Sequence, residues 1–437
     1  MTETSGTAHG STSRPLPVLD QDPFGPEVLT DPLSFDTALR DAGPLVRLST
    51  HDVYATGRYA EVRAALRDWQ GLASGAGVGL SNFRTEKPWR SLSVLLEADP
   101  PHHDAPRWVL AELLGPAAQR RLRARWAEVA EETVDRLLTG PPGSSVTFDA
   151  VPSLAEAYPL RVFPDALGIP DEGREHLLPF SDFLLNAFGP RNDLVSRGAP
   201  HARALSAWVS DHCTRETYAG EGDGFGARIW AAADRGEITP RQAPLVVRSL
   251  FAAGVNTTVH ALAALLQALA THPDQWRRLR AEPSLARAAF DEAVRWASPV
   301  QTFFRTATGE VRVGGSVVPD GSKVLLFLGA ANRDPRRWPD PDTFDITRDP
   351  SGHLGFGFGI HQCVGQSLAR LEAECLLTAL VRRVETLEPA GPARRRLNNT
   401  LRSWDSVPVR VRLAGSEQNV SSIPSGCLPR TIEEYTV

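Results

Sequence analysis

The sequence predicts a mainly α-helical fold with a long central helix and small β-sheets at one side. Apolar residues recur at helical spacing, between Pro and Gly breaks, over nearly all of residues 106–290. Short β-like runs lie outside that stretch, and strands do not alternate with helices as a parallel sheet would require. Residues 18–414 are therefore expected to form one large helical domain.

In chain order, the first expected elements are a hairpin and a helix. Residues 45–48 and 52–56 have the pattern of two short strands, and residues 59–68 that of a helix. The glycine-rich stretch 73–79 lacks a strong preceding strand and a following helix start, so a mobile loop is favoured over a dinucleotide site. After the helical region, β-like runs return at 309–318, 323–327 and 407–413.

The composition is that of a globular protein without a strong charge bias. The 437 residues are 42% apolar and 23% charged, and the formal net charge of −5 gives no basic field for nucleic acid. The four cysteines show no CxxC pairing. A zinc site and a disulfide scaffold are therefore disfavoured, and a reducing cytosol is favoured.

The two chain ends differ from the rest of the sequence. Residues 1–17 are rich in Ser, Thr and Gly, so we expect a disordered leader and neither a signal peptide nor a membrane anchor. Residues 415–437 follow the last expected strand and are expected to be a disordered tail. Arg248, Asn256 and His260 interrupt the most apolar helical run, 244–270, which argues against a membrane span. The prediction is a soluble, cytoplasmic protein.

The stretch from Phe356 to Gly365 contains three glycines, a histidine and a cysteine, and a helical pattern follows from Gln366. Glycines allow a tight loop. Cys363 would then lie at the mouth of the helix, where the dipole and free N–H groups favour a thiolate. A thiolate is a known axial ligand of haem iron. The alternative is an inert, buried cysteine beside a glycine-rich turn.

A proline-rich turn, beginning at Asp99, precedes a second set of candidate residues. His103 and Arg107 are one helical turn apart and can point to the same side, where they would suit a bound carboxylate. The alternative is a helix cap with a solvated Arg. Glu292 and Arg295, three residues apart, can pair on a helix as a structural feature.

The central helix is expected over about residues 244–272, a length of roughly 40 Å. Gly254 and the neighbouring Thr257 and Thr258 weaken its middle. Such a point often marks a local opening at a functional site, where a flat ligand can approach the backbone. A close helix crossing, which also selects small residues, is the alternative.

In this order, the turn at Asp99, the AGxxTT pattern around Gly254, the ExxR pair and the FGxGxHxCxG loop resemble the cytochrome P-450 superfamily of haem-thiolate monooxygenases. The resemblance spans roughly residues 20–413. It implies a haem b cofactor with Cys363 as the thiolate ligand of the iron. It also implies that Glu292, Arg295 and Arg348 form a structural network. The other cofactor-binding residues that it implies are His103, Arg107, Arg305, Phe356, Gly357, His361 and Gly365.

Segments around 86–90, 158–166, 186–190, 299–305, 333–338 and 398–402 are similar to bacterial members that demethylate para-methoxybenzoate. The likeness implies that Arg90, Ser93, Arg248 and Ser249 anchor a substrate carboxylate. An apolar slot would leave the para group facing the iron. The residues that the likeness places along this slot are Leu96, Leu185, Phe188, Ala253 and Phe303.

Two positions depart from the resemblance. Leu185 stands where these demethylases carry a second pocket Phe, so the slot should be wider or differently shaped. Asn256 stands before Thr257, where most members carry an acid that relays protons together with the Thr. Because Asn cannot lose a proton, the relay should be slower. A slow monooxygenase, a variant chain, and chemistry without the usual oxygen–oxygen cleavage all remain open.

The resemblance implies oxidation of a para-substituted benzoic acid by dioxygen. Electrons would come from an iron–sulfur ferredoxin and its NAD(P)H-dependent reductase. Four arginines could form a basic landing face for the ferredoxin. Oxidation of another small acid or a natural product is the alternative within enzymes, and a haem-binding sensor or carrier is the alternative outside them. The four arginines are Arg120, Arg121, Arg123 and Arg125.

Overall fold

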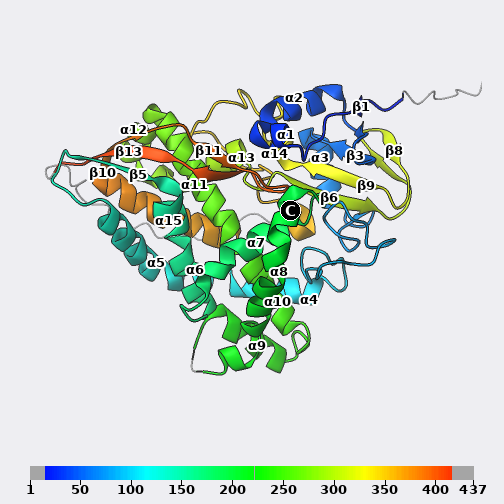
Figure 1. Cartoon of the computed structure of the whole chain (residues 1–437), viewed down its shortest axis with the longest axis horizontal. Coiled ribbons are helices and arrows are strands. Elements are labelled where there is room, and N and C mark those ends of the chain that lie inside the picture. Colours follow the sequence, from blue (N-terminus) through cyan, green and yellow to red (C-terminus); the bar gives the residue numbers. More distant parts are fainter. Residues whose placement is uncertain (1–14, 221, 416–437) are drawn as a thin grey trace, which may run out of the picture.

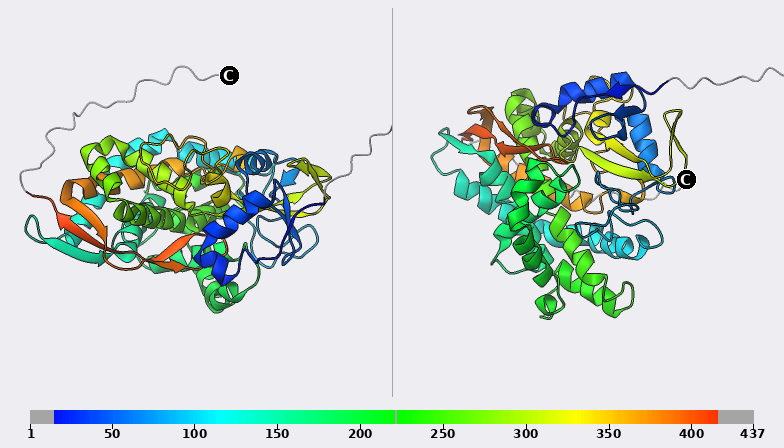
Figure 2. Two further views of the ribbon diagram at one scale, coloured as in Figure 1. Left: turned by 90° about the horizontal axis from the view of Figure 1, so that it is seen from above. Right: turned by 45° about the vertical axis from the view of Figure 1, so that its right-hand side comes forward.

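The computed structural model describes residues 15–220 and 222–415 as a mainly helical molecule of roughly triangular outline (Figure 1) that is thinner in the perpendicular view (Figure 2). Helices fill most of the body, and the largest sheet lies at one corner beside α2 and α3. Residues 1–14 of the predicted leader 1–17 and residues 416–437 of the predicted tail 415–437, with Cys427, lie outside the described residues. Leu16 and Pro17 belong to the folded body, since Leu16 packs against a buried cluster and the carbonyl of Pro17 accepts the N–H of Arg47.

The helices carry most of the structure. In chain order the α-helices are α1 (Pro26–Thr30), α2 (Pro32–Ala42), α3 (Tyr59–Arg67), α4 (Asp104–Leu113), α5 (Pro116–Leu137), α6 (Pro159–Leu167), α7 (Leu177–Asn186), α8 (Asp193–Asp211), α9 (Phe225–Asp234), α10 (Ala243–Ala253), α11 (Asn256–Thr271), α12 (Pro273–Ala281), α13 (Ala286–Ala297), α14 (Leu328–Asn332) and α15 (Gln366–Arg383). Shorter turns are the π-helical η1 (Val151–Glu156) and the 3₁₀ turns η2 (Arg174–His176), η3 (Glu216–Tyr218), η4 (Pro283–Leu285) and η5 (Gly359–His361).

The strands form one larger sheet and three small ones. The six-stranded sheet has the order β1-β2-β3-β9-β6-β4, and the others are β10-β13-β5, β11-β12 and β7-β8. The strands are β1 (Val18–Leu19), β2 (Val46–Leu48), β3 (Val53–Thr56), β4 (Leu72–Ala73), β5 (Ser145–Asp149), β6 (Thr302–Ala307), β7 (Val311–Val313), β8 (Ser316–Val318), β9 (Lys323–Phe327), β10 (Val384–Pro389), β11 (Arg394–Arg396), β12 (Ser403–Ser406) and β13 (Pro408–Leu413).

Strand β6 connects the larger sheet to the functional region. It pairs antiparallel with β9, and Phe303 lies opposite Leu326. Side chains two residues apart on a strand share a face. Phe303 and Arg305 therefore project to one side, while Phe304 packs into a buried cluster on the other.

The structure confirms several elements that the sequence predicts, namely the β2–β3 hairpin, helix α3, the β7–β8 hairpin, and strands β9 and β13. The stretch 106–290 is less uniformly helical than predicted, because β5 lies within it and pairs with β13. That pairing depends on a partner more than 250 residues away in the chain, which local periodicity does not report.

The long central helix is interrupted in its middle, at the weak point that the sequence predicts. Helix α10 ends at Ala253 and α11 begins at Asn256. A Cβ atom added to Gly254 would lie 2.2 Å from Cζ of Phe163, so only glycine fits there. The predicted local opening is confirmed, and the close packing offered as its alternative is present as well.

Two hydroxyl groups bond to the carbonyls at the interruption. Ser181 Oγ on α7 donates to the carbonyl of Ala252 at 2.6 Å, and Thr257 Oγ donates to the carbonyl of Ala253 at 2.8 Å. Carbonyls at the end of a helix lack intrahelical partners. These side chains satisfy them and stabilise the bend.

Residues Ala243–Thr271 are long and apolar enough to cross a membrane by length and composition alone. In the structure, 72% of the most apolar window of this segment is buried within the protein. That burial is typical of a core helix.

A buried ion-pair network joins α13 to the loop after α14. Arg295 donates to both carboxylate oxygens of Glu292 at 2.7 and 2.8 Å, and neither side chain is exposed. Arg348 adds a contact to Glu292 at 3.3 Å. The other Arg295 donors bond the carbonyls of Asn332 and Pro341. The structure thus contains the predicted network, and its full hydrogen bonding compensates for the burial of charge.

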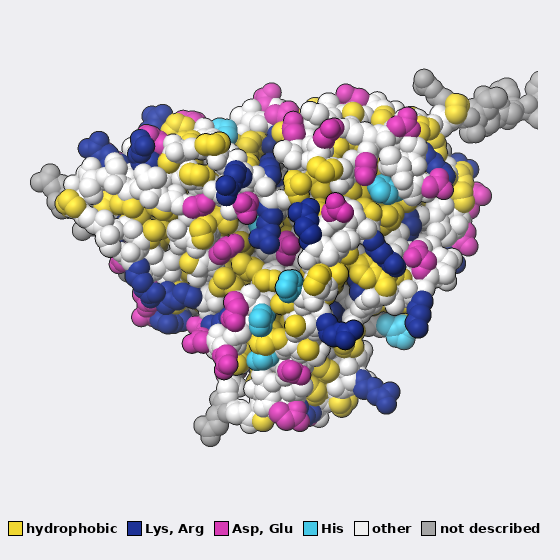
Figure 3. All heavy atoms as spheres, viewed as in Figure 1, with side chains coloured by type: hydrophobic (Ala, Val, Ile, Leu, Met, Phe, Trp, Pro, Cys, Tyr) yellow, Lys and Arg dark blue, Asp and Glu magenta, His cyan; other side chains and the backbone are white. Residues whose placement is uncertain are grey.

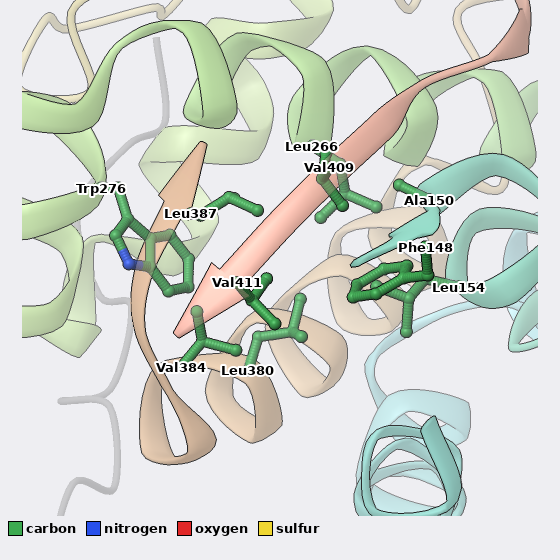
Figure 4. A pocket seen from close by; sticks show the side chains of 10 residues that line it. All are labelled: Phe148, Ala150, Leu154, Leu266, Trp276, Leu380, Val384, Leu387, Val409 and Val411. Atoms are coloured by element: carbon green, nitrogen blue, oxygen red, sulfur yellow. The ribbon is translucent and has the colours of Figure 1, made fainter. Parts of the chain in front are cut away.

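An apolar cavity of about 10 Å³ lies between α11, α12, α15 and the β10-β13-β5 sheet (Figure 4). Ten apolar side chains line it, among them Leu266, Trp276 and Val409. A space of this size is near the lower limit for one water molecule and offers it no polar partner. We interpret it as a packing gap in the core.

We expect Arg295→Ala to lower the free energy of unfolding by about 3–5 kcal/mol, because it leaves Glu292 as an uncompensated buried charge. Urea unfolding followed by circular dichroism measures the change. Arg235→Ala, which removes an exposed ion pair with Glu237, is the control and should shift the unfolding midpoint little. Equal shifts in the two variants would contradict a structural role for the buried pair.

Candidate active site

The loop that carries Cys363 is fixed between α3 and α15. Gly357 and Gly359 have φ values of +70° and +75°, which favour glycine. A Cβ atom at Gly359 would also lie 2.7 Å from the carbonyl oxygen of Leu66 on α3. The N–H of Cys363 donates to the carbonyl of Phe356 at 2.8 Å and closes the loop. The local sequence therefore determines where the thiol is held.

The electrostatics at Cys363 are more balanced than the sequence predicts. Burial raises the pKa of the thiol above its ordinary value. The N–H groups of Gly365 and Gln366 and the charges of Arg107 and Arg370 lower the pKa but do not outweigh burial. The N–H groups at the helix mouth thus favour the thiolate, as expected from the sequence, while burial opposes it. A metal ion bound to the sulfur would favour the thiolate further.

Four nitrogen-bearing side chains, those of His103, Arg107, Arg305 and His361, gather near this loop. The rings of His103 and His361 lie 4.8 Å apart, edge to face. Burial lowers the pKa of Arg305 to about 10, and the charge of Arg305 also lowers the pKa of His361. Asp99 contributes to the electrostatics of both groups as their acidic neighbour.

These groups have hydrogen-bonding capacity to spare. Nε2 of His361 is buried without a hydrogen-bond partner among the described residues, and lies 3.8 Å from Asp99, too far for a hydrogen bond. The guanidinium of Arg305 makes one hydrogen bond within the described chain, to the carbonyl of Phe304. An anionic group with several acceptor oxygens would satisfy them. The two propionates of a haem have that chemistry.

Cys363 also faces open space. Its surroundings are dense with protein, yet the residue is exposed, and so is Ala253 at the end of the largely buried α10. Both the thiol and this part of the central helix are thus accessible from within the fold. The donor set, the thiol and the accessible helix fit a haem with a cysteine ligand.

The Asn256–Thr257 pair lies at the start of α11. Asn256 is buried, and its Nδ2 has no hydrogen-bond partner among the described residues. Thr257 is partly exposed and uses its O–H to bond the carbonyl of Ala253, which leaves its oxygen free to accept a hydrogen bond. The pair can therefore hold a polar molecule but has no acid.

Most of the predicted slot residues come together in one apolar cluster, as expected. Leu185 and Phe188 are buried there, and Phe303 and Leu96 pack against them. The rings of Phe188 and Phe303 lie 6.1 Å apart. Val78 and Leu401, which the sequence did not suggest, complete the cluster, whereas Ala253 is not part of it.

The predicted carboxylate anchor Arg90 is already paired. Both of its terminal nitrogens donate to Glu97, at 2.7 and 2.5 Å, and the two side chains are 7% and 1% exposed. Glu97 also accepts the N–H groups of Val78 and Ser93. The hydroxyl of Ser93 accepts from the N–H groups that follow it in the chain. Arg90 therefore orders the loop through Glu97.

Arg248 is different, because its guanidinium makes no hydrogen bond or ion pair with any described residue. It is half-buried on α10, lies 5.6 Å from the ring centre of Phe180, and has its pKa lowered mainly by burial. The charges of Arg90 and Glu97 also reach it. Ser249 donates its hydroxyl to the carbonyl of Leu245. Of the predicted anchors, Arg248 has the greatest unmet demand for an anion.

Sequence reasoning missed Glu97 and Lys323. Lys323 on β9 is buried and donates to the carbonyl of Gly77 at 2.7 Å and to Thr306 Oγ1 at 3.1 Å, which ties the glycine-rich loop to the sheet. Burial lowers the pKa of Lys323 to about 7. The short separation of seven residues between Arg90 and Glu97 could have indicated that the two side chains pair. Lys323 pairs with a distant loop and gave no local signal.

The basic landing face predicted on α5 is largely neutralised. Arg123 pairs with Glu374 at 2.6 Å, Arg125 with Glu128 at 2.7 Å, and Arg121 with Asp223. Basic and acidic side chains are also interspersed over the face of the molecule in Figure 3. The excess positive charge expected on α5 is therefore smaller than its sequence suggests.

Three features together indicate a haem-thiolate oxygenase. The body is mainly helical, a cysteine lies on a glycine loop before a long helix, and cationic donors lie around that cysteine. Comparison with known proteins agrees. A family model described as cytochrome P-450 matches residues 231–401. The chain is 52% identical over 412 residues to cytochrome P-450 CYP199A2 of Rhodopseudomonas palustris, covering 93% of this chain and 97% of that protein. The chain belongs to the cytochrome P-450 family, and the family implies a haem with a cysteine thiolate ligand.

More distant relatives share the length and the fold. The chain is 34% identical to a β-dihydromenaquinone-9 ω-hydroxylase of Mycobacterium tuberculosis, covering 91% of this chain and 79% of that protein. Among solved structures, cytochrome P-450 CREJ in complex with (4-ethylphenyl) dihydrogen phosphate superposes with a TM-score of 0.80 at 26% identity, over 89% of this chain and 98% of that one. The predicted oxygenase class and fold are confirmed.

We expect the contribution of Lys323 to the free energy of unfolding to rise with pH between about pH 7 and about pH 10, because Lys323 is deprotonated more readily in the folded chain than in the unfolded one. The contribution is at most about 1.4 kcal/mol per pH unit. Urea unfolding at several pH values measures the slope. The difference in unfolding free energy between the wild-type protein and Lys323→Met should therefore grow with pH over this range, whereas the difference from the exposed Lys87→Met should not; equal slopes in all three proteins would contradict the prediction.

Proposed function

We propose that the protein oxidises para-substituted benzoic acids and that its most direct reaction is the O-demethylation of 4-methoxybenzoate. Dioxygen, two electrons and two protons would convert the methoxy group to a hydroxyl group, with formaldehyde and water as the other products. The observation that carries the proposal is the half-buried Arg248, which has no hydrogen bond or ion pair with any described residue. Its charge interacts with that of Arg90, which lies over the Phe188 ring of the apolar cluster.

Arg90 connects Arg248 to the slot. The positive charge of Arg90 contributes to the lowered pKa of Arg248, after burial, and the Arg90 guanidinium lies 4.7 Å from the ring centre of Phe188. A benzoate has one charge and a flat apolar ring. Its carboxylate would complete the hydrogen bonding of Arg248, and its ring would pack in the aromatic cluster. Leu185 would set the room left for the para group.

We assign the haem to Cys363, His103, Arg107, Arg305 and His361. A bound haem would supply the one-electron chemistry that activates dioxygen. The protein's own residues orient the substrate and control protons. Cys363 would supply the thiolate, and the nitrogen donors would bind the propionates. The propionate oxygens would accept the hydrogen bonds that His361 and Arg305 do not make within the described chain. Phe356, Gly357 and Gly365 would shape the loop beneath the haem.

Bacterial members of the family generally take electrons from a ferredoxin and its reductase. We infer the same iron–sulfur ferredoxin and NAD(P)H-dependent reductase here, in the cytoplasm. Since three arginines on α5 are ion-paired, docking there would have to displace or share those acidic partners.

Adding 4-methoxybenzoate to the ferric protein should shift the Soret band from low to high spin, and turnover with ferredoxin, reductase and NADH should release formaldehyde. Arg248→Gln should raise the dissociation constant by about 10- to 150-fold, the value of a hydrogen bond to a charged group. Arg90→Gln should have a smaller effect on binding, because Arg90 is satisfied by Glu97.

The methyl ester of 4-methoxybenzoate is the matched control, since it lacks the charge and its affinity should not depend on Arg248. If no small aromatic acid perturbs the spectrum, the substrate proposal is wrong. Oxidation of another small acid or a natural product would then be favoured, because Leu185 makes a slot of different shape.

We expect Asn256→Asp to increase product formation with dioxygen by about tenfold or more, because it restores an ionisable group beside Thr257. The dissociation constant for the substrate should stay unchanged, since position 256 lies away from the anchoring cation. Steady-state turnover and spectral titration measure the two quantities. Equal turnover in both proteins would show that the missing acid does not limit the reaction.

A further inference from the structure

One side of α11 carries buried polar atoms with no partner. Nδ1 and Nε2 of His260 and Nδ2 of Asn256 are all buried, and none has a hydrogen-bond partner among the described residues. The two residues are four apart, so both side chains can lie on the same side of the helix. Buried polar groups in proteins are nearly always hydrogen-bonded, to protein or to ordered water. This side of α11 is therefore suited to ordered water molecules.

Several elements that pack against α11, the helix of His260, carry charged groups. The elements α7, η1 and the β11–β12 hairpin pack near this helix and carry Asp182, Glu156, Arg396 and Asp405. Nε of Arg396 lies 3.6 Å from Asp182 Oδ1. Apart from burial, the positive charge of Arg396 acts to lower the pKa values of both His260 and Glu156. The side chains of Asp182 and Arg396 are 20% and 41% exposed, so this group of residues reaches solvent.

The protonation states suit transfer of protons. Burial raises the pKa values of Asp182 and Glu156, and Arg396 partly offsets this. Burial lowers the pKa of His260 to about 3, so its ring is neutral near pH 7. A neutral imidazole has one N–H donor and one acceptor nitrogen. It can take a proton at one nitrogen and release one from the other, which Asn256 cannot do.

We propose that His260 carries protons from the Asp182 side of the molecule to the Asn256–Thr257 bend, in place of the acid that position 256 lacks. A water molecule on the Asp182 side gives a proton to the acceptor nitrogen of His260 and takes one from the protonated Asp182 carboxyl, which solvent then reprotonates. In the same step the other ring nitrogen releases its proton to a water molecule held by Asn256. The ring then turns over to restore the first tautomer. No electrons move, and each proton comes from solvent.

The proposal rests on the oxygenase class and not on the identity of the substrate. In the proposed transfer of protons, His260 contacts neither the substrate nor the haem. Its role is to position and pass protons, so its test needs a measurement that a purely structural histidine would not change.

The first test measures proton exchange without turnover. The holoprotein, labelled with ¹⁵N-histidine and held in its diamagnetic reduced carbon monoxide form, gives the exchange rate of the His260 ring N–H with water. The signal is assigned by its loss in His260→Asn. We expect exchange near pH 7 to be fast, and Asp182→Asn to slow it by about tenfold or more. Protection for hours, as in a dry core, or an unchanged rate in Asp182→Asn would overturn the proposal.

The second test uses the reaction. His260→Asn should lower the fraction of NADH electrons that end in product and raise the solvent deuterium isotope effect. Asn256→Asp in the His260→Asn background should restore both, because it supplies an acid by another route. The exposed His201→Asn is the matched control and should change neither quantity. Unchanged coupling and isotope effect in His260→Asn would overturn the proposal.

Haem content and circular dichroism establish that each variant is folded. Should His260→Asn fail to fold, His260→Gln keeps a similar side-chain length without an ionisable ring and is judged by the same two outcomes.

Discussion

The central helix is interrupted beside the close contact between Phe163 and Gly254, and the distal half of the site lies at that interruption. Any side chain at Gly254 would collide with the Phe163 ring. Helix α10 ends at Ala253 and α11 starts at Asn256, and the hydroxyl groups of Ser181 and Thr257 bond the carbonyls at the end of α10. Asn256 and Thr257 thus lie beside a tightly packed part of the core, where glycine is required at position 254.

Two buried carboxylates organise the rest of the site in different ways. Glu292 is part of a network that joins α13 to a distant loop and is wholly enclosed. Glu97 bonds Arg90 and two N–H groups of its own loop, and so determines which cation stays available to a substrate. Each of the two carboxylates accepts two hydrogen bonds from an arginine, and these bonds compensate for the burial of the negative charge.

Motif residues could be predicted from the sequence because they depend on local geometry. The glycine loop, its cysteine, and the Glu292–Arg295 pair lie within a few residues of their partners, so spacing alone was informative. The weak point at Gly254 was also visible, although Phe163 as its cause was not. In contrast, β5 pairs with β13, Lys323 bonds Gly77, and Arg396 approaches Asp182 across large distances in the chain. No local pattern reports such contacts. The pairing of Arg90 with Glu97 shows a further limit, because a residue type suited to an anion does not reveal which anion already occupies it.

The guanidinium of Arg248, which makes no ion pair within residues 15–220 and 222–415, has a consequence for the stability of the fold. Burying a charge without a counter-ion costs free energy, and the ligand-free chain bears that cost at α10. A ligand that binds the folded chain alone raises its stability by an amount that grows with the logarithm of ligand concentration. An anion at Arg248 would relieve the cost where α10 approaches the interruption of the central helix. Substrate supply and the lifetime of the folded protein would then be coupled, so that the cell would retain most of this protein when its anionic ligand is abundant.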